Sequence, residues 1–181
     1  MSFSTTGVTV WLTGLSGAGK TTTARQVIND LKTQHVSAIL LDGDELRDGL
    51  SEGLGFTAEG RAEAVRRAGE IALIAAKQGI VAIVSMVSPH EAPRQLVRQR
   101  HDEAGITFIE VHVATPIEVC EERDPKDLYR RARAGQESSL TGVQQSYEKP
   151  TDPELRLSTS TLSPSEASML ILEKIGLGLP T

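Results

Sequence analysis

A glycine-rich motif near the start of the chain constrains its fold more than any other feature of the sequence. Residues 14–21 read Gly-Leu-Ser-Gly-Ala-Gly-Lys-Thr and match the pattern G-x-x-x-x-G-K-[ST] in full. An apolar, β-branched run at 8–12 precedes the motif, and a helical pattern follows it from Lys20. A glycine-rich loop between a strand and a helix turns backbone N–H groups inward around phosphates, at the positive end of the helix dipole. We therefore predict a phosphate-binding loop.

The residues of this loop have separate expected roles in binding ATP with Mg²⁺. The Lys20 ammonium can reach the β- and γ-phosphates, and the Thr21 hydroxyl can ligate the metal ion. A chance glycine-rich turn is the alternative, and the agreement of strand, motif and helix disfavours it. The predicted ATP contacts within the loop are Gly14, Ser16, Gly17, Ala18, Gly19, Lys20 and Thr21.

Apolar runs alternate with helical patterns along the rest of the chain. The strand-like runs lie at 38–41, 80–86 and 108–113, and the helical patterns at 62–77, 92–101, 116–122 and 166–175. Strands that alternate with helices predict a parallel sheet covered by helices on both faces. The length of 181 residues suits one domain over 1–181. We expect a three-layer α/β sandwich of the P-loop NTPase type.

Composition and charge exclude several classes of function. The formal net charge is -5, so no overall basic character indicates binding to a nucleic-acid backbone. The single cysteine, Cys120, rules out a disulfide within the chain, and we interpret it as a packed small side chain. Residues 1–7 lack the features of a signal peptide, and no apolar run is long enough to span a bilayer. We expect a cytoplasmic protein without nucleic-acid or membrane partners.

A polar stretch at 123–150 is the predicted mobile lid of the domain. It carries several arginines and few large apolar side chains that could anchor it. The chain lacks the N-K-x-D motif expected of a GTPase, and it is small for a motor ATPase. A small domain with a basic lid therefore favours a kinase that acts on a nucleotide or metabolite.

Carboxylates follow the second predicted strand, where the sequence reads Leu-Asp-Gly-Asp-Glu-Leu-Arg at 41–47. Ligands of open α/β sheets bind outside the carboxyl ends of the strands. Asp44 can there hold the magnesium shell or accept the acceptor's proton, and Arg47 can meet an anionic acceptor. A turn that caps a helix is the alternative interpretation of Asp42 and Asp44.

In these segments and in several others, the chain resembles the adenylylsulfate kinases, which phosphorylate the 3′-hydroxyl of adenosine 5′-phosphosulfate with ATP. The resemblance extends from Gly7 to about Leu157. Its most particular part runs from Cys-Glu-Glu-Arg-Asp-Pro-Lys at 120–126 to Ala-Arg-Ala-Gly at 132–135. The other matching segments are 14–22, 41–44, Leu-Gly-Phe at 54–56, Arg66-Arg67, Ser88-Pro89, Tyr129, Thr-Gly at 141–142 and Tyr147-Glu148.

The resemblance implies roles in catalysis and on the ATP side. Asp44 would be a metal-linked or general-base carboxylate, and Lys126 would lie near the transferring phosphoryl group or the charge of the acceptor. Thr22 would extend the phosphate loop, and Arg123 and Arg133 would belong to the ATP side and the lid. The resemblance also implies a homodimer.

On the acceptor side, the resemblance implies that Arg47, Phe56 and Arg61 hold the nucleotide, with Phe56 stacking on its base. Asp44 and Lys126 would also contact this acceptor. A core aromatic is the alternative interpretation of Phe56. Arg66 and Arg67 are more typical of a solvated helix face than of ligands.

Four departures from the family pattern lie on the acceptor side or in the lid. Ala64 replaces an asparagine, and Leu140, after Ser138-Ser139, replaces a second aromatic that would clamp the adenine. Val-Gln-Gln-Ser at 143–146, which includes Gln144, replaces Ile-Asp-Asp-Pro, and His90-Glu91 replaces an aromatic and an arginine. Leu140 is therefore a candidate acceptor contact of altered character, while the ATP side matches the family.

Three hypotheses follow from the sequence. The first is an adenylylsulfate kinase. The second keeps phosphoryl transfer but changes the acceptor to another nucleotide derivative or a small anionic alcohol. The third is a regulatory subunit that binds nucleotide without catalysis, and intact Lys20, Thr21 and Asp44 disfavour it.

Overall fold

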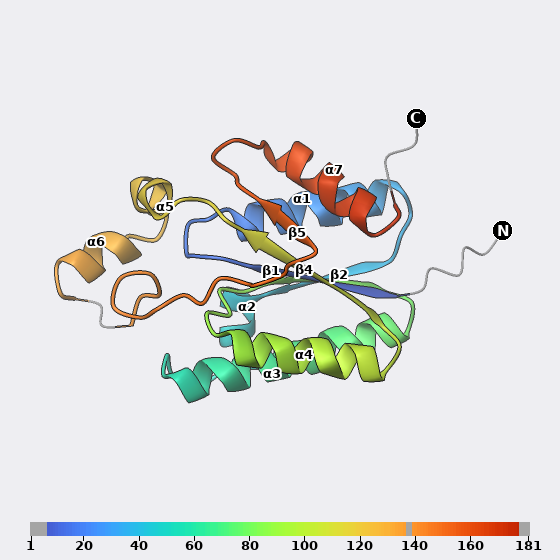
Figure 1. Ribbon diagram of the computed structural model, residues 1–181, viewed down its shortest axis with the longest axis horizontal. Helices are drawn as coiled ribbons and strands as arrows, with labels where there is room; N and C mark the ends of the chain where they lie inside the picture. Colours follow the sequence, from blue (N-terminus) through green and yellow to red (C-terminus); the bar gives the residue numbers. More distant parts are fainter. Residues whose placement is uncertain (1–6, 137–138, 178–181) are drawn as a thin grey trace.

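The computed structural model of this chain describes residues 7–136 and 139–177. The ends of the predicted domain, and Glu137 and Ser138 of the predicted lid, lie outside the described residues. Within the described part, five strands form a parallel sheet in the order β2-β3-β1-β4-β5 (Figure 1). The strands are β1 (Val8–Thr13), β2 (Ala38–Asp42), β3 (Val81–Ser85), β4 (Thr107–Val113) and β5 (Leu155–Leu157). The predicted α/β class with a parallel sheet is confirmed.

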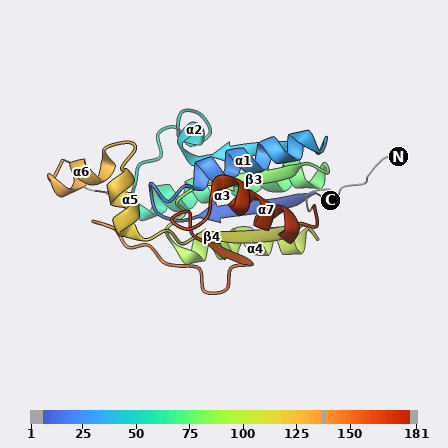
Figure 2. The ribbon, with the colours of Figure 1, turned by 90° about the horizontal axis from the view of Figure 1, so that it is seen from above.

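Seven helices accompany this sheet in the described residues, and the four long ones cover its two faces (Figure 1). The seven helices are α1 (Lys20–Thr33), α2 (Gly43–Arg47), α3 (Ala58–Lys77), α4 (Glu91–Glu103), α5 (Ile117–Arg123), α6 (Leu128–Arg133) and α7 (Pro164–Lys174). Figure 1 shows α1 and α7 on one face and α3 and α4 on the other, and each of these pairs is in contact. Helices α5 and α6 lie beyond the end of the sheet that is opposite the N-terminus (Figures 1 and 2).

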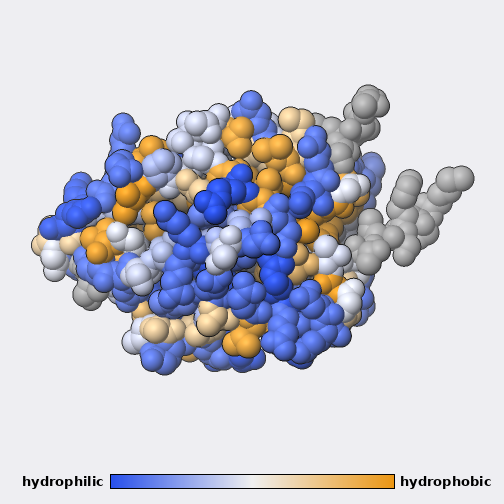
Figure 3. Space-filling view, viewed as in Figure 1, coloured by the Kyte–Doolittle hydropathy of each residue, from blue (hydrophilic) through white to orange (hydrophobic). Residues whose placement is uncertain are grey.

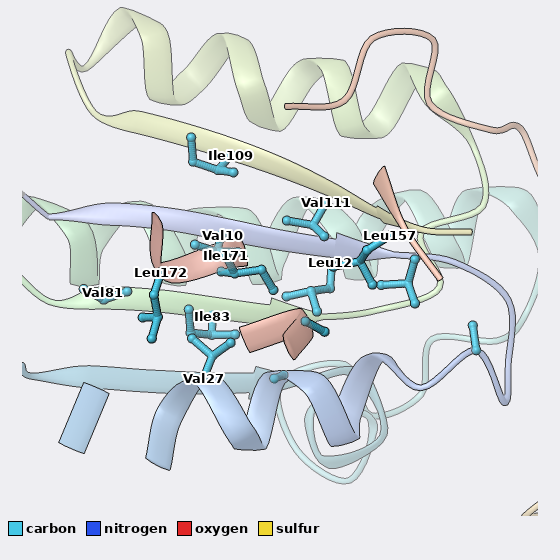
Figure 4. Close-up of a cluster of buried hydrophobic side chains, with 14 of the residues drawn as sticks. Val10, Leu12, Val27, Val81, Ile83, Ile109, Val111, Leu157, Ile171 and Leu172 are labelled. Atoms are coloured by element: carbon cyan, nitrogen blue, oxygen red, sulfur yellow. The ribbon is translucent and has the colours of Figure 1, made fainter. Parts of the chain in front are cut away.

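The central strands are buried on both faces, which explains their continuous apolar runs. Successive side chains of a strand point to opposite faces, so β1 supplies two different clusters. Val10 and Leu12 join the cluster beneath α1 and α7, where Ile171 also packs (Figure 4). Trp11 joins the cluster beneath α3 and α4 together with Val84. The sheet is therefore a rigid platform whose strand ends can position a site.

Residues at several helix ends form capping interactions. The Thr57 hydroxyl accepts a hydrogen bond from Gly60 N at 3.1 Å at the start of α3. Ser163 and Glu166 form a reciprocal capping box at the start of α7. After α3, Gly79 has a φ of 77°, a left-handed conformation that favours glycine. These ends define the long helices that frame the sheet.

Two short elements of the structure, β5 and α6, are not predicted from the sequence, and a third, α2, is predicted only by the capping interpretation of Asp42. Strand β5 has three residues, and its pairing with β4 joins distant parts of the chain. Helix α6 lies inside the charged stretch and has only six residues. Helix α2 begins where the Asp42 carboxylate accepts from Asp44 N at 3.0 Å, so the capping interpretation of Asp42 is confirmed. All three elements lie near the predicted site residues, which are found at the carboxyl ends of the strands.

The face of the molecule in Figure 3 is mostly hydrophilic, with apolar residues interspersed among charged ones. Among the described residues, the large apolar side chains that are exposed are scattered over several elements. Ile74 on α3 and Leu96 on α4 are the most exposed of them. The helices of the described chain include none with the length and apolar character to cross a membrane.

Candidate active site

A cavity of about 840 Å³ opens at the carboxyl ends of the strands. Its volume is in the range typical of small-molecule sites. Most predicted site residues line it: Ser16, Gly17, Gly19, Lys20, Thr21, Thr22, Asp44, Arg47, Phe56, Arg61, Arg123, Lys126 and Leu140. Gly14 and Ala18 lie within the same loop behind this surface. Among the described residues, Arg133 is outside the lining, and its guanidinium instead pairs with Glu121 of α5 at 2.6 Å.

The phosphate loop forms one end of the cavity. Its glycines adopt left-handed conformations, with φ of 74° at Gly17 and 94° at Gly19. A Cβ at Gly17 would lie 2.9 Å from the Cys120 carbonyl oxygen, so the loop rests directly on α5. The Cys120 side chain is fully buried in the core, which confirms its interpretation as a packing residue, and burial raises the pKa of its thiol. The loop is thus held close to the core and open toward the cavity.

Lys20 lies at the first position of α1 and is almost completely buried. Its Nζ donates to the carbonyl oxygens of Gly14 and Leu15 at 3.0 and 2.8 Å. Burial lowers the pKa of Lys20 to about 8, against the opposing effect of nearby acidic groups that include Asp44 and Asp42. A phosphate group beside this ammonium would favour its charged form. Lys20 is therefore placed to exchange backbone carbonyls for phosphate oxygens.

Three oxygen-bearing side chains meet beside the loop at the ends of two strands. The Thr21 hydroxyl donates to Asp42 Oδ2 at 2.8 Å and lies 3.3 Å from Ser85 Oγ. Asp42 pairs in register with Ser85 because β2 and β3 are neighbours, and both side chains are buried. Hydroxyl and carboxylate oxygens are the donors that Mg²⁺ prefers, with nucleotide phosphates completing its shell. These residues therefore fit a magnesium site, whereas the sequence predicts Thr21 and Asp44 as the metal-linked pair.

Asp44 also lines the cavity and forms an ion pair with Lys126. Asp44 is on α2, and Lys126 is on the turn between α5 and α6, so the pair connects two sides of the cavity. Both side chains are at least half exposed to the cavity and solvent. The structure thus brings together two of the three predicted catalytic residues. Among the described residues, no cluster of three or more His, Cys, Asp or Glu side chains is arranged to hold a metal ion.

Phe56 forms the opposite end of the cavity, where two arginines flank its ring. The guanidinium carbons of Arg47 and Arg61 lie 4.3 and 5.3 Å from the ring centroid. Phe56 is 49% exposed, so it is not a core aromatic. Arg61 is buried and donates to the carbonyls of Phe56 and Ser139 at 3.2 and 2.7 Å. Arg61 therefore ties the aromatic segment to the segment that precedes Leu140.

The positions that depart from the family pattern occupy different environments. Leu140 is buried and lines the cavity, whereas Ala64 packs in the core on α3 and is outside the cavity lining. Gln144 donates to the Ala132 carbonyl at 3.1 Å, and the neighbouring Gln145 donates to the Phe56 carbonyl at 3.2 Å. Glu91 accepts a hydrogen bond from Thr151 at 2.9 Å. Ser138 lies outside the described residues.

A buried arginine supports the wall of the cavity at Ser88-Pro89. The Arg94 guanidinium donates to Glu110 Oε1 at 2.7 Å, to the Ser88 carbonyl at 2.8 Å and to the Glu148 carbonyl at 2.9 Å. Ser88 has a φ of 38°, which is uncommon for a residue with a side chain. The interactions of Arg94 therefore hold this wall in place from inside the protein.

Sequence reasoning missed several residues that the fold brings to the site. Thr159 follows β5 and accepts a hydrogen bond from Arg123 at 2.7 Å, which places Arg123 beside the phosphate loop. The resemblance points to Asp44 rather than Asp42 as the metal-linked carboxylate, and no motif marks Ser85. The register of β2 with β3 and the position of β5 place these residues, and neither follows from local sequence.

The comparisons with known proteins agree on one family. Residues 6–158 match the family described as adenylylsulphate kinase. The chain is 46% identical over 167 residues to the adenylyl-sulfate kinase of Enterobacter sp. (strain 638), an alignment that covers 91% of this chain and 81% of that protein. It superposes with a TM-score of 0.91 and 42% identity on the APS kinase CysC of Mycobacterium tuberculosis in complex with AMPPNP and APS, covering 94% of this chain and 98% of that one. The hexameric APS kinase of Thiobacillus denitrificans matches with a TM-score of 0.72 and 33% identity, over 97% of this chain and 30% of that one.

Proposed function

This chain belongs to the adenylylsulphate kinase family, and from that premise we propose that it transfers the γ-phosphoryl group of ATP to the 3′-hydroxyl of adenosine 5′-phosphosulfate. The products are ADP and 3′-phosphoadenosine 5′-phosphosulfate. One observation carries the proposal: a single cavity joins a complete phosphate loop to an aromatic ring flanked by two arginines, with Asp44 and Lys126 between them.

At the ATP end, the loop and the N-terminus of α1 bind the phosphates through backbone N–H groups. Helix α1 begins after Gly19 without a side-chain cap, so its first N–H groups are available to an anion. Lys20 stabilises the negative charge that develops on the β–γ bridging oxygen as the bond to the γ-phosphorus breaks. Arg123, held by Thr159, lies beside the loop and contributes positive charge.

We assign the magnesium site to Thr21 and Asp42, with Ser85 as a supporting hydroxyl. Bound Mg²⁺ would neutralise charge on the phosphates. Asp42 is the better candidate than Asp44 because Asp42 already accepts the Thr21 hydroxyl, whereas Asp44 pairs with Lys126. This assignment leaves Asp44 available for the acceptor.

Asp44 is the proposed general base. Its carboxylate would accept the proton of the acceptor's 3′-hydroxyl as that oxygen forms a bond to the γ-phosphorus. Lys126 would leave Asp44 when substrates bind and would then meet negative charge on the transferring group. The ion pair keeps both side chains near the reacting position before the substrates arrive.

The acceptor end binds an anionic nucleotide. Phe56 offers an exposed ring face on which an adenine can stack. Arg47 provides positive charge for the phosphosulfate, while Arg61 fixes the Phe56 backbone and closes the cavity toward Ser139. Leu140 gives apolar contact without an aromatic face, and this observation favours a second candidate: transfer to a different nucleotide derivative with the same chemistry.

An acceptor panel tests the proposed function. Purified protein is mixed with ATP and Mg²⁺, and ADP release is measured for adenosine 5′-phosphosulfate, other adenosine nucleotides and small anionic alcohols. We expect the highest kcat/KM for adenosine 5′-phosphosulfate. Faster transfer to another acceptor would select the second candidate, and ADP release that no acceptor stimulates would contradict both.

We also propose a cytoplasmic location and a homo-oligomeric state for this protein. The single cysteine supports the first. The family resemblance and the hexameric assembly in the Thiobacillus denitrificans relative support the second. Light scattering of the purified chain would measure its oligomeric state.

A further inference from the structure

The carbonyl groups of the phosphate loop need hydrogen-bond donors behind the loop. A peptide unit that turns its N–H toward a phosphate turns its C=O the other way. A buried carbonyl without a donor is costly, so these groups must be satisfied. The first two are satisfied within the motif, where Lys20 donates to the carbonyls of Gly14 and Leu15. The next three carbonyls receive their donors from outside the motif.

Tyr129 supplies the donor for the Ser16 carbonyl. Its hydroxyl donates to Ser16 O at 2.9 Å, and its ring is buried in the main hydrophobic cluster. The Asp124 carboxylate fixes the start of α6 because it accepts from the backbone N–H groups of Tyr129 and Arg130 at 3.1 and 2.9 Å. The phenol therefore reaches the loop from a firmly placed helix.

The carbonyls of Gly17 and Ala18 receive donors from the same side. Arg123 NH1 lies 3.4 Å from the Gly17 carbonyl oxygen. The hydroxyls of Thr115 and Thr159 both donate to the Ala18 carbonyl, at 3.0 and 2.8 Å. Three consecutive loop carbonyls are thus held by side chains that follow β4 and β5 in the chain.

Each of these bonds also sets the direction of an N–H group. The Ser16 carbonyl and the Gly17 N–H belong to one planar peptide unit, so a donor on the carbonyl orients the N–H toward the cavity. Gly17, at a φ of 74°, has the backbone freedom to let this peptide rotate. An outside donor is therefore needed to keep the phosphate-binding direction.

We infer that Tyr129 is a positioning residue for ATP binding, which acts by fixing the Ser16–Gly17 peptide of the phosphate loop. Thr115 has the same role toward the Ala18–Gly19 peptide. The inference rests on the proposed function, since it takes the loop to bind the phosphates of ATP. It assigns to helices α5 and α6 a task distinct from that of a lid: they brace the loop from behind.

The chain offers a matched pair of variants, because it has two tyrosines. Tyr129→Phe removes the hydroxyl that reaches Ser16, and Tyr147→Phe removes a hydroxyl that lies 3.0 Å from Thr13 Oγ1. Calorimetry measures the Kd of ADP, of inorganic tripolyphosphate and of adenosine 5′-phosphosulfate for each purified variant. Tripolyphosphate reports on the loop alone, and the acceptor nucleotide reports on the opposite end of the cavity.

For Tyr129→Phe we expect ADP and tripolyphosphate to bind about three- to tenfold more weakly, the effect of one net hydrogen bond. The acceptor Kd should stay unchanged, and Tyr147→Phe should leave the Kd of tripolyphosphate unchanged. Unaltered tripolyphosphate binding by Tyr129→Phe, or equal weakening of the acceptor, would overturn the inference. An unaltered protein that binds no ADP would instead refute the proposed function.

A second variant keeps the inference testable if Tyr129→Phe does not fold. Thr115→Val conserves shape, removes one donor to the Ala18 carbonyl and lies outside the cavity lining. A smaller selective loss of tripolyphosphate affinity is expected, because the Thr159 hydroxyl still donates to the Ala18 carbonyl. Equal affinities of this variant and the unaltered protein for tripolyphosphate would overturn the role assigned to these donors.

Discussion

The two ends of the cavity are held by different kinds of interaction. At the ATP end, one continuous motif supplies the contacts, and it lies between a fully buried strand and a fourteen-residue helix. At the acceptor end, Phe56 is half exposed, and its segment is fixed by hydrogen bonds from Arg61 and Gln145, which are far apart in the sequence. The motif at the ATP end is therefore local in sequence, although distant side chains such as Tyr129 brace it, whereas the acceptor end joins separate segments through Arg61 and Gln145.

From this difference we predict where substitutions can be made without loss of phosphoryl transfer. A change in the loop alters the group that stabilises the transferring phosphoryl, whereas a change near Phe56 alters the fit of one ligand. The departure at Leu140 lies beside the Ser139 carbonyl that Arg61 contacts. Gln144, in contrast, is outside the cavity lining and donates to Ala132 of α6. We expect mutations at the two ends to affect different kinetic constants.

The largest effect expected at the ATP end is that of Lys20→Ala on turnover. Removal of one preorganised charge at the transferring group costs at least about 10²-fold in kcat. The loss should be the same for every acceptor, because Lys20 belongs to the ATP end. Steady-state kinetics and circular dichroism of the folded variant provide the measurement. Near-normal kcat in a folded Lys20→Ala protein would contradict the assignment of the loop.

The pH dependence of ADP binding should also separate the two ends. Burial lowers the pKa of Lys20 to about 8, and phosphate binds to the charged form. As pH rises through this pKa, binding must first restore the proton, so ADP affinity should fall about tenfold per pH unit. The Lys20→Met variant should lack this slope. The arginines of the acceptor end stay charged throughout this range, so they give ADP affinity no pH dependence. An ADP affinity that does not change with pH would contradict the role assigned to Lys20.

A smaller effect is expected for Leu140→Phe at the acceptor end. An added aromatic face could clamp the acceptor base opposite Phe56, so the KM for adenosine 5′-phosphosulfate should fall about two- to tenfold. The KM for ATP should not change. Leu162→Phe is the matched control, because Leu162 lines the cavity with Thr159 and Pro164 near the ATP end. Ala64→Asn should contribute little to binding of the acceptor, because position 64 is packed in the core.

A raised acceptor KM in Leu140→Phe, with ATP kinetics unchanged, would indicate that the pocket is shaped for a different acceptor. Equal changes in both KM values would show that the two ends are not separable.

The smallest expected effect concerns backbone protection in the predicted lid, 123–150. Hydrogen exchange should slow in this stretch when nucleotide binds. We expect the change to be concentrated in 139–150, because α6 is anchored by the buried Tyr129 and capped by Asp124. Protection that is already strong in the free protein and unchanged by nucleotide would refute the lid.

The parts of this fold that the sequence predicts are those fixed by local pattern. The loop 14–21 and the long helices follow from spacing and capping within one segment. The Thr21–Asp42 hydrogen bond depends on how β2 pairs with β3, which no local pattern specifies. Tyr129 illustrates the same limit, since a tyrosine inside a charged stretch gives no sign that its hydroxyl will reach Ser16.

The site of phosphorylation tests the central claim most directly. With ATP, Mg²⁺ and adenosine 5′-phosphosulfate, ³¹P NMR of the product should show a new phosphate on the 3′-oxygen and an intact phosphosulfate. Asp44→Asn should slow this reaction by about 10²-fold or more, the contribution of a general base, with ADP affinity retained. Phosphate on another oxygen, release of inorganic phosphate alone, or an unaltered rate in Asp44→Asn would contradict the account.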